Sequence, residues 1–128
     1  MRIFVLGNPL LEEDSLPVKL LPELRREFPK IEFREIDPNE GFPEGDIVII
    51  DTIINARDVV VIKDIDALEE SPNYSAHDFD LAFALKLMKK MGKIGRVTII
   101  GVPPKGRKIL ASLKKIIPSA LSESGRRS

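Results

Sequence analysis

The stretch Asp46-Ile-Val-Ile-Ile-Asp51 decides the fold, because it sets four β-branched residues in a row between two aspartates. A strand that is apolar on both faces is typical of the centre of a parallel sheet with helices on both sides. Asp51 falls at the C-terminal end of this strand, and sheets of this class bind their ligands just beyond that end. The sequence therefore predicts an α/β fold with Asp51 at the functional edge.

Four further segments predict the strands that surround this one. Residues 2–6 indicate a buried first strand, residues 96–102 another buried strand, and the more polar residues 31–36 a strand nearer the edge of the sheet. Residues 58–63 follow Asp51 too closely for a helical crossover. This strand is therefore expected to run antiparallel to its predecessor.

Three segments show the helical spacing of apolar residues. The first covers about residues 16–28, and Pro22 within it predicts a kink or a late helix start. The second ends at Gly92, and its apolar residues are Phe79, Ala82, Phe83, Leu87 and Met91. The last covers about residues 107–117, and the polar residues 119–128 are expected to form a flexible tail.

The resulting order of elements is β-α-β-β-β-α-β-α. It predicts a three-layer α/β sandwich around a mostly parallel, twisted sheet with one antiparallel strand. A chain of 128 residues is long enough for one domain with one sizeable core, which we assign to residues 1–118. Three loops then follow strands at the functional edge of the sheet: residues 7–15, 51–55 and 101–106.

The composition excludes several functional classes. The chain is 43% hydrophobic and 31% charged, as expected of a soluble globular protein. Its 20 basic and 20 acidic residues cancel, which argues against a general nucleic-acid or membrane-surface binder. The absence of cysteine excludes thiolate metal sites and cysteine nucleophiles. With no signal peptide and no membrane-spanning run in the sequence, a cytoplasmic location is expected.

His77 is the only histidine in the chain, so it is the one candidate for a neutral-pH base or a nitrogen ligand. It follows Ser75, and the spacing of Ser75 and Asp78 is that of a capping box at a helix start. The positive end of the helix dipole there favours the neutral imidazole, the form that binds a metal or accepts a proton. Taken alone, an isolated histidine is more often structural than functional.

Carboxylates are expected beside this histidine. The helix start has to pack near the functional edge, which makes Glu12, Glu13, Asp14 and Asp51 its expected neighbours. Such an oxygen and nitrogen set suits a borderline divalent ion such as nickel, zinc, iron or manganese. A His77-based triad lacks a serine in a nucleophile elbow, and a phosphate loop after the first strand would carry acid in place of lysine. An aspartic dyad of Asp14 and Asp51 stays conceivable, as does a merely solvated acidic helix start.

Four motifs follow one another along the chain: Gly7-Asn-Pro-Leu-Leu with Glu13-Asp14, Asp46-Ile-Val-Ile-Ile-Asp51, Ser75-Ala-His77, and Ile99-Ile-Gly-Val-Pro-Pro. Together they resemble the signature of the hydrogenase maturation endopeptidases and span residues 1 to about 104. The chain departs from that signature where Ser15-Leu16-Pro17 stands in place of Gly-x-Gly. The resemblance implies an α/β sandwich and a protease that removes a C-terminal peptide from the large-subunit precursor of a nickel–iron hydrogenase.

The resemblance also implies roles for individual residues. Asp14, Asp51 and His77 would bind nickel that arrives with the precursor, so the isolated protein can be metal-free, and Glu13 occupies the preceding acidic position. Asp14 and Asp51 are the implied catalytic residues. Either a carboxylate or the metal would activate water. The alternatives are a non-catalytic metal-binding or assembly module on the same scaffold, and a small α/β domain with no site.

Overall fold

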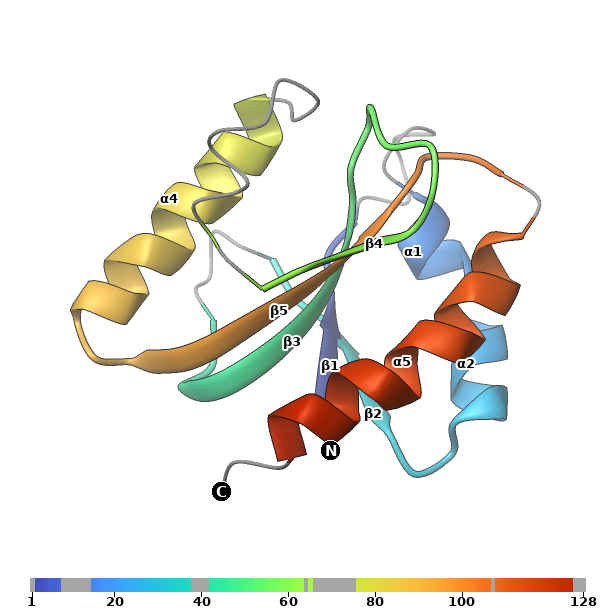
Figure 1. Cartoon of the computed structure of the whole chain (residues 1–128), viewed down its shortest axis with the longest axis horizontal. Coiled ribbons are helices and arrows are strands. Elements are labelled where there is room, and N and C mark those ends of the chain that lie inside the picture. Colours follow the sequence, from blue (N-terminus) through green and yellow to red (C-terminus); the bar gives the residue numbers. More distant parts are fainter. Residues whose placement is uncertain are drawn as a thin grey trace.

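Strand β3 (Gly45–Thr52) lies at the centre of the sheet in a computed structural model of the chain (Figure 1). The structure describes residues 2–7, 15–37, 42–63, 65, 76–106 and 108–125, with the backbone alone at residues 76–80 and 122–125. Within these residues the sheet has five strands in the order β2-β1-β3-β5-β4. The other strands are β1 (Arg2–Val5), β2 (Glu32–Glu35), β4 (Val60–Ile62) and β5 (Ile94–Val102).

All of these strands are parallel except β4. β1 pairs with both β2 and β3, and β3 pairs with β5 from Gly45 opposite Ile94 to Thr52 opposite Val102. β4 pairs antiparallel with β5, with Ile62 opposite Ile99. The predicted direction of β4 is therefore confirmed, but its neighbour is β5 and not the preceding strand. The reason is that the longer β5 occupies that side of β3.

Helices cover both faces of the sheet, as predicted for a three-layer sandwich (Figure 1). One face carries α4, and the other carries α1, α2 and α5. Their bounds are α1 Leu16–Lys19, α2 Leu21–Glu27, α4 Ala76–Lys90 and α5 Ile109–Gly125. None of the helices in the described residues is both long enough and apolar enough to cross a membrane.

The residues of β3 alternate between two buried clusters. Ile47 and Ile49 belong to the cluster under α4, and Val48 and Ile50 belong to the cluster under α2 and α5. Successive side chains of a strand point to opposite faces, so a strand covered on both sides needs an unbroken apolar run. This is the physical reason for the β-branched stretch that predicted the fold.

The first predicted helix is divided in two. α1 ends at Lys19 and α2 begins at Leu21, with Pro22 in the first turn of α2. A proline is tolerated there because the first N–H groups of a helix have no partner within it. Helical structure begins at Leu16 as predicted, and Pro22 is accompanied by a break in the helix between Lys19 and Leu21.

Helix α5 is longer than predicted. It continues past Pro118 to Gly125, so the tail expected from residue 119 is helical up to that point. Ala120 and Leu121 are both buried against the rest of the core. Their packing extends the apolar stripe beyond the proline and explains why the helix does not end there. The last helix therefore extends beyond the end expected near residue 117.

Helix α4 ends where the sequence predicted, at Gly92. The backbone of Gly92 has a φ of 73°, and its N–H donates to the carbonyl of Lys89 at 3.1 Å. The N–H of Lys93 donates to the carbonyl of Met88 at 3.0 Å. These two bonds form a Schellman motif, which needs a left-handed residue that glycine supplies at the lowest cost.

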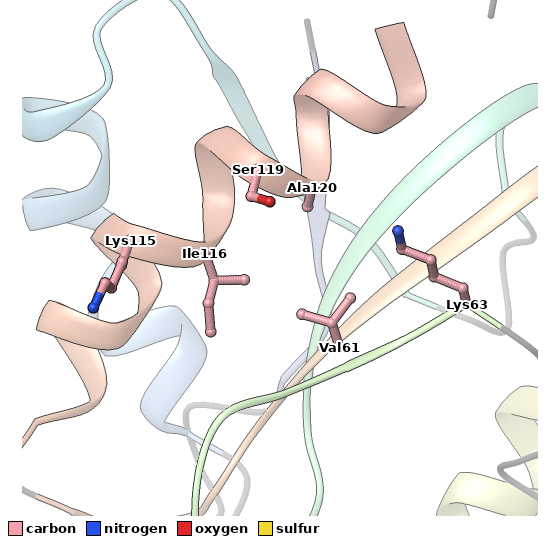
Figure 2. Close-up of a pocket in the computed structure, with 6 residues that line it drawn as sticks. All are labelled: Val61, Lys63, Lys115, Ile116, Ser119 and Ala120. Carbon is pink, nitrogen blue, oxygen red and sulfur yellow. The ribbon is translucent and has the colours of Figure 1, made fainter. Parts of the chain in front are cut away.

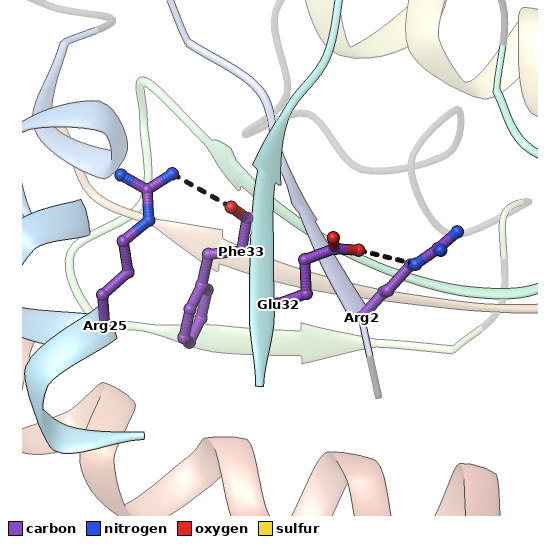
Figure 3. A network of polar contacts seen from close by, with 4 residues as sticks. All are labelled: Arg2, Arg25, Glu32 and Phe33. Carbon is purple, nitrogen blue, oxygen red and sulfur yellow. Dashed lines mark hydrogen bonds and ion pairs between the residues drawn. The ribbon is translucent and has the colours of Figure 1, made fainter. Parts of the chain in front are cut away.

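The β2 edge of the sheet is held by two polar contacts (Figure 3). Arg2 Nε lies 2.6 Å from Glu32 Oε2, between side chains that face each other across β1 and β2. Arg25 on α2 donates a hydrogen bond of 3.0 Å to the carbonyl of Phe33. The second contact ties the outer strand to the helix that covers it. The Arg2–Glu32 contact lies at the start of the strands, whereas Asp51 lies at their C-terminal end.

Candidate functional site

Asp51 is a buried carboxylate at the C-terminal end of β3. It is 1% exposed, and its Oδ1 accepts a hydrogen bond of 2.8 Å from the N–H of Thr52. Because Ile47, Ile49 and Ile53 of the same strand face are packed in the cluster under α4, Asp51 points to that side of the sheet. The strand and the hydrogen bond together fix the carboxylate at the edge where α/β sheets bind ligands.

Thr52 adds a second buried polar group at this edge. It is 1% exposed, and its hydroxyl has no hydrogen-bond partner within the described part of the chain. A buried hydroxyl of this kind costs about 1–3 kcal/mol when nothing satisfies it. Buried polar groups without a hydrogen-bond partner are rare, and those found near a candidate site often have a functional role.

An aliphatic wall stands beside Asp51. Gly101 of β5 lies directly opposite Asp51 in the register. A Cβ atom built on Gly101 would collide with Cδ1 of Ile53 and would come within 3.0 Å of a methyl of Val60. Glycine is therefore needed for Ile53 to pack across β5. The resulting wall is apolar, and charge interactions beside it are stronger than in water.

His77 lies in the first turn of α4, where the sequence predicted it. The C-terminal end of α4 leads through Gly92 into the start of β5, so α4 runs back along the sheet and its first turn reaches the edge where β3 ends (Figure 1). The structure therefore brings the backbone of His77 and the side chain of Asp51 to the same edge and the same face. The side chain of His77 lies outside the described residues.

Asp14 and Glu13 also lie outside the described residues. The described chain resumes at Ser15, which is buried and precedes α1; its carbonyl accepts the N–H of Lys19 at 3.0 Å. α1 packs against β3, the strand that carries Asp51. Across the ranges that the structure covers, no three His, Cys, Asp or Glu residues are grouped to hold a metal ion. The metal-binding roles of Asp14, Asp51 and His77 remain predictions.

A separate cavity of about 380 Å³ opens between β4 and α5 (Figure 2). It is lined by Val61, Lys63, Lys115, Ile116, Ser119 and Ala120. Val61 is next to Ile62 in β4, and Ile62 belongs to the cluster under α4. Because successive side chains of a strand point to opposite faces, Val61 faces the other side of the sheet. The cavity carries no carboxylate or imidazole and lies on the other face from Asp51. It is therefore not part of the site.

Three solved structures share this arrangement, and two of them are described as hydrogenase maturation enzymes. The chain is similar to the hydrogenase maturating endopeptidase HybD from E. coli, with a TM-score of 0.62, 19% identity, and coverage of 98% of this chain and 94% of that one. The chain has the fold of these endopeptidases. An endopeptidase from Escherichia coli, solved in solution, gives a TM-score of 0.68 at 21% identity, again covering 98% and 94% of the two chains.

A third structure, a hydrogenase 3 maturation protease, gives a TM-score of 0.60 at 20% identity and covers 91% of this chain and 86% of that one. No protein-family model matches the chain, and no curated protein matches it either. The resemblance that the four sequence motifs indicated is thus confirmed at the level of the fold. It extends over nearly the whole length of the chain.

Three features of this edge were missed by the sequence reasoning. The sequence placed Thr52, Ile53 and Gly101 in loops at the functional edge, but it gave none of them a role beside Asp51. The alternation of β3 could have placed Ile53 on the same face as Asp51. The pairing of Gly101 with Asp51 needed the register of two strands that lie far apart in the chain.

Proposed function

We propose that this protein is an endopeptidase of hydrogenase maturation, which removes the C-terminal peptide from the nickel-loaded precursor of a hydrogenase large subunit. The observation that carries the proposal is the buried carboxylate of Asp51 at the functional edge of a sheet whose fold is shared with two hydrogenase maturation enzymes and a further endopeptidase. The start of α4, which holds His77, reaches the same edge. The sequence motifs supply Asp14 from the loop after β1.

The chemistry assigned to Asp51 is that of a positioned carboxylate. The N–H of Thr52 holds one oxygen, so the carboxylate does not need to reorganise when substrate arrives. In the proposed reaction it binds the nickel of the precursor or accepts a proton from the attacking water. The water adds to the scissile carbonyl, the C–N bond breaks, and the proton passes to the leaving amine. His77 and Asp14 complete the nickel-recognising set.

The test is to incubate the purified protein with a nickel-loaded large-subunit precursor and to follow the released peptide by mass spectrometry. Asp51→Asn keeps the shape of the side chain and removes its charge, so we expect the trimming rate to fall by about 10²-fold or more. We expect His77→Ala to lower the trimming rate as well.

The matched control is Asp46→Asn. Asp46 lies near the opposite end of β3, is exposed, and accepts a hydrogen bond of 2.8 Å from the N–H of Arg96. Its substitution should leave trimming unchanged. Unaltered trimming by Asp51→Asn would refute the assigned site. Precursor binding without any peptide release would instead identify a non-catalytic assembly module.

A further inference from the structure

Helix α4 exposes a stripe of large apolar side chains on the side that faces away from the sheet. Phe83, Leu87 and Met91 are 68%, 50% and 55% exposed, whereas Leu81, Ala82 and Leu85 are buried against the sheet. The exposed residues are spaced four apart, so they form one continuous row over two turns. Single exposed apolar residues are ordinary, but a contiguous row of this kind marks an interaction surface. We call it the α4 stripe.

The charged residues along α4 are divided by sign: Asp78 and Asp80 precede the stripe, and its C-terminal half is accompanied by lysines. Between residues 81 and 93 the chain has four lysines, Lys86, Lys89, Lys90 and Lys93, and no acidic residue. The whole protein has a formal net charge of zero, so this local excess belongs to the C-terminal half of α4 and the turn that follows it. A partner that complements the C-terminal half of the stripe therefore offers apolar side chains with carboxylates beside them.

The stripe is also continuous with the candidate site. His77 lies in the first turn of the same helix, and Phe83 follows fewer than two turns later. A large-subunit precursor is a folded macromolecule, and it has to be held in register for one peptide bond to reach Asp51. A contact along α4 would give it a footprint that begins at the site.

We propose that the α4 stripe is the docking surface for an acidic, apolar-faced segment of the hydrogenase large-subunit precursor. This inference rests on the proposed function. A second copy of this chain is one alternative occupant, although a parallel pairing of two stripes would bring two sets of lysines together. An anionic membrane surface is the other alternative. It is less well matched because α4 already buries its opposite face against the sheet, and three side chains give little area for insertion.

The experiment measures kcat and KM for the trimming of nickel-loaded precursor by the full chain. The double substitution Phe83→Gln/Leu87→Gln replaces two residues of the apolar row by glutamine, which is a good helix former. We expect KM to rise about tenfold, which corresponds to about 1.4 kcal/mol of binding, with kcat unchanged. Lys89→Glu/Lys90→Glu should also raise KM, and this increase should shrink as the salt concentration is raised toward about 1 M, where the screening length is only about 3 Å.

Matched controls lie on the other face of the sheet. Lys108→Glu/Lys115→Glu makes the same change in net charge near α5, and Val61→Thr alters an exposed apolar residue outside the stripe. Both should leave KM unchanged. Circular dichroism and thermal unfolding confirm that each variant is folded.

The possible outcomes separate the inference from the proposed function. If wild type trims the precursor and the stripe variants trim it with unchanged KM, the docking surface is wrong and the proposed function stands. If wild type neither binds nor trims the precursor, both are wrong. Light scattering that shows a dimer lost in Phe83→Gln/Leu87→Gln, or binding to phosphatidylserine vesicles lost in the same variant, would assign the stripe to one of the other occupants and overturn the inference.

Discussion

Replacing Gly101 by alanine should destabilise the protein through one identifiable collision. The new Cβ would meet Cδ1 of Ile53 and would lie 3.0 Å both from Cγ1 of Ile53 and from Cγ2 of Val60. Ile53 is fully buried, so it cannot move into solvent to relieve the contact. Overpacking of a buried site by one methyl group typically costs about 1–3 kcal/mol, and we expect a loss of this size in the free energy of unfolding.

A double-mutant cycle tests this reasoning directly. Ile53→Val removes Cδ1, the atom in closest contact, and should by itself cost about 0.5–1.5 kcal/mol. In the double variant Gly101→Ala/Ile53→Val, the lost methyl makes room for the added one, so the double variant should be more stable than the sum of the two single changes predicts. Urea unfolding followed by circular dichroism measures all three values. Additive losses within about 0.3–0.5 kcal/mol would refute the proposed contact.

Three further predictions concern stability. Gly92→Ala should lower the free energy of unfolding by about 1 kcal/mol, because Gly92 has a φ of 73° at the end of α4, and no loss would contradict the Schellman motif. Leu85→Ala should cost about 2.7–5 kcal/mol in urea unfolding, because Leu85 is fully buried on the side of α4 that faces the sheet, whereas Leu87→Ala on the exposed side should cost far less. Thr52→Val should leave stability unchanged or raised, because the hydroxyl has no partner within the described residues; a loss above about 1 kcal/mol would show that it is satisfied in the folded protein.

Local patterns in the sequence were sufficient for most of the secondary structure. The β-branched run before Asp51 predicted the central strand because a strand covered on both faces must be apolar on both. Gly92 predicted the end of α4 because a left-handed residue ends a helix at the lowest cost when it has no Cβ. Where local signals conflicted with packing, packing prevailed. Pro118 did not end α5, because Ala120 and Leu121 are buried beyond it.

The tertiary structure decided what no local pattern contains. The helical spacing of apolar residues predicted one apolar stripe on α4. In the structure Ala82 is buried, whereas Phe83, Leu87 and Met91 face away from the sheet. Which side of a helix is covered depends on where the helix lies, and not on its own sequence. The same is true of the pairing between β5 and its neighbours on either side, which joins residues far apart in the chain.

For the candidate site, the sequence alone determined that Asp51 ends a central strand and that His77 starts a helix, because both follow from local spacing. The tertiary structure decided that α4 runs back along the sheet and brings the two positions to one edge and one face. It also decided that Asp51 is buried, held by Thr52, and walled by Ile53 packed over Gly101. Burial and strand register are properties of distant segments in contact, so they exist only once the chain has folded.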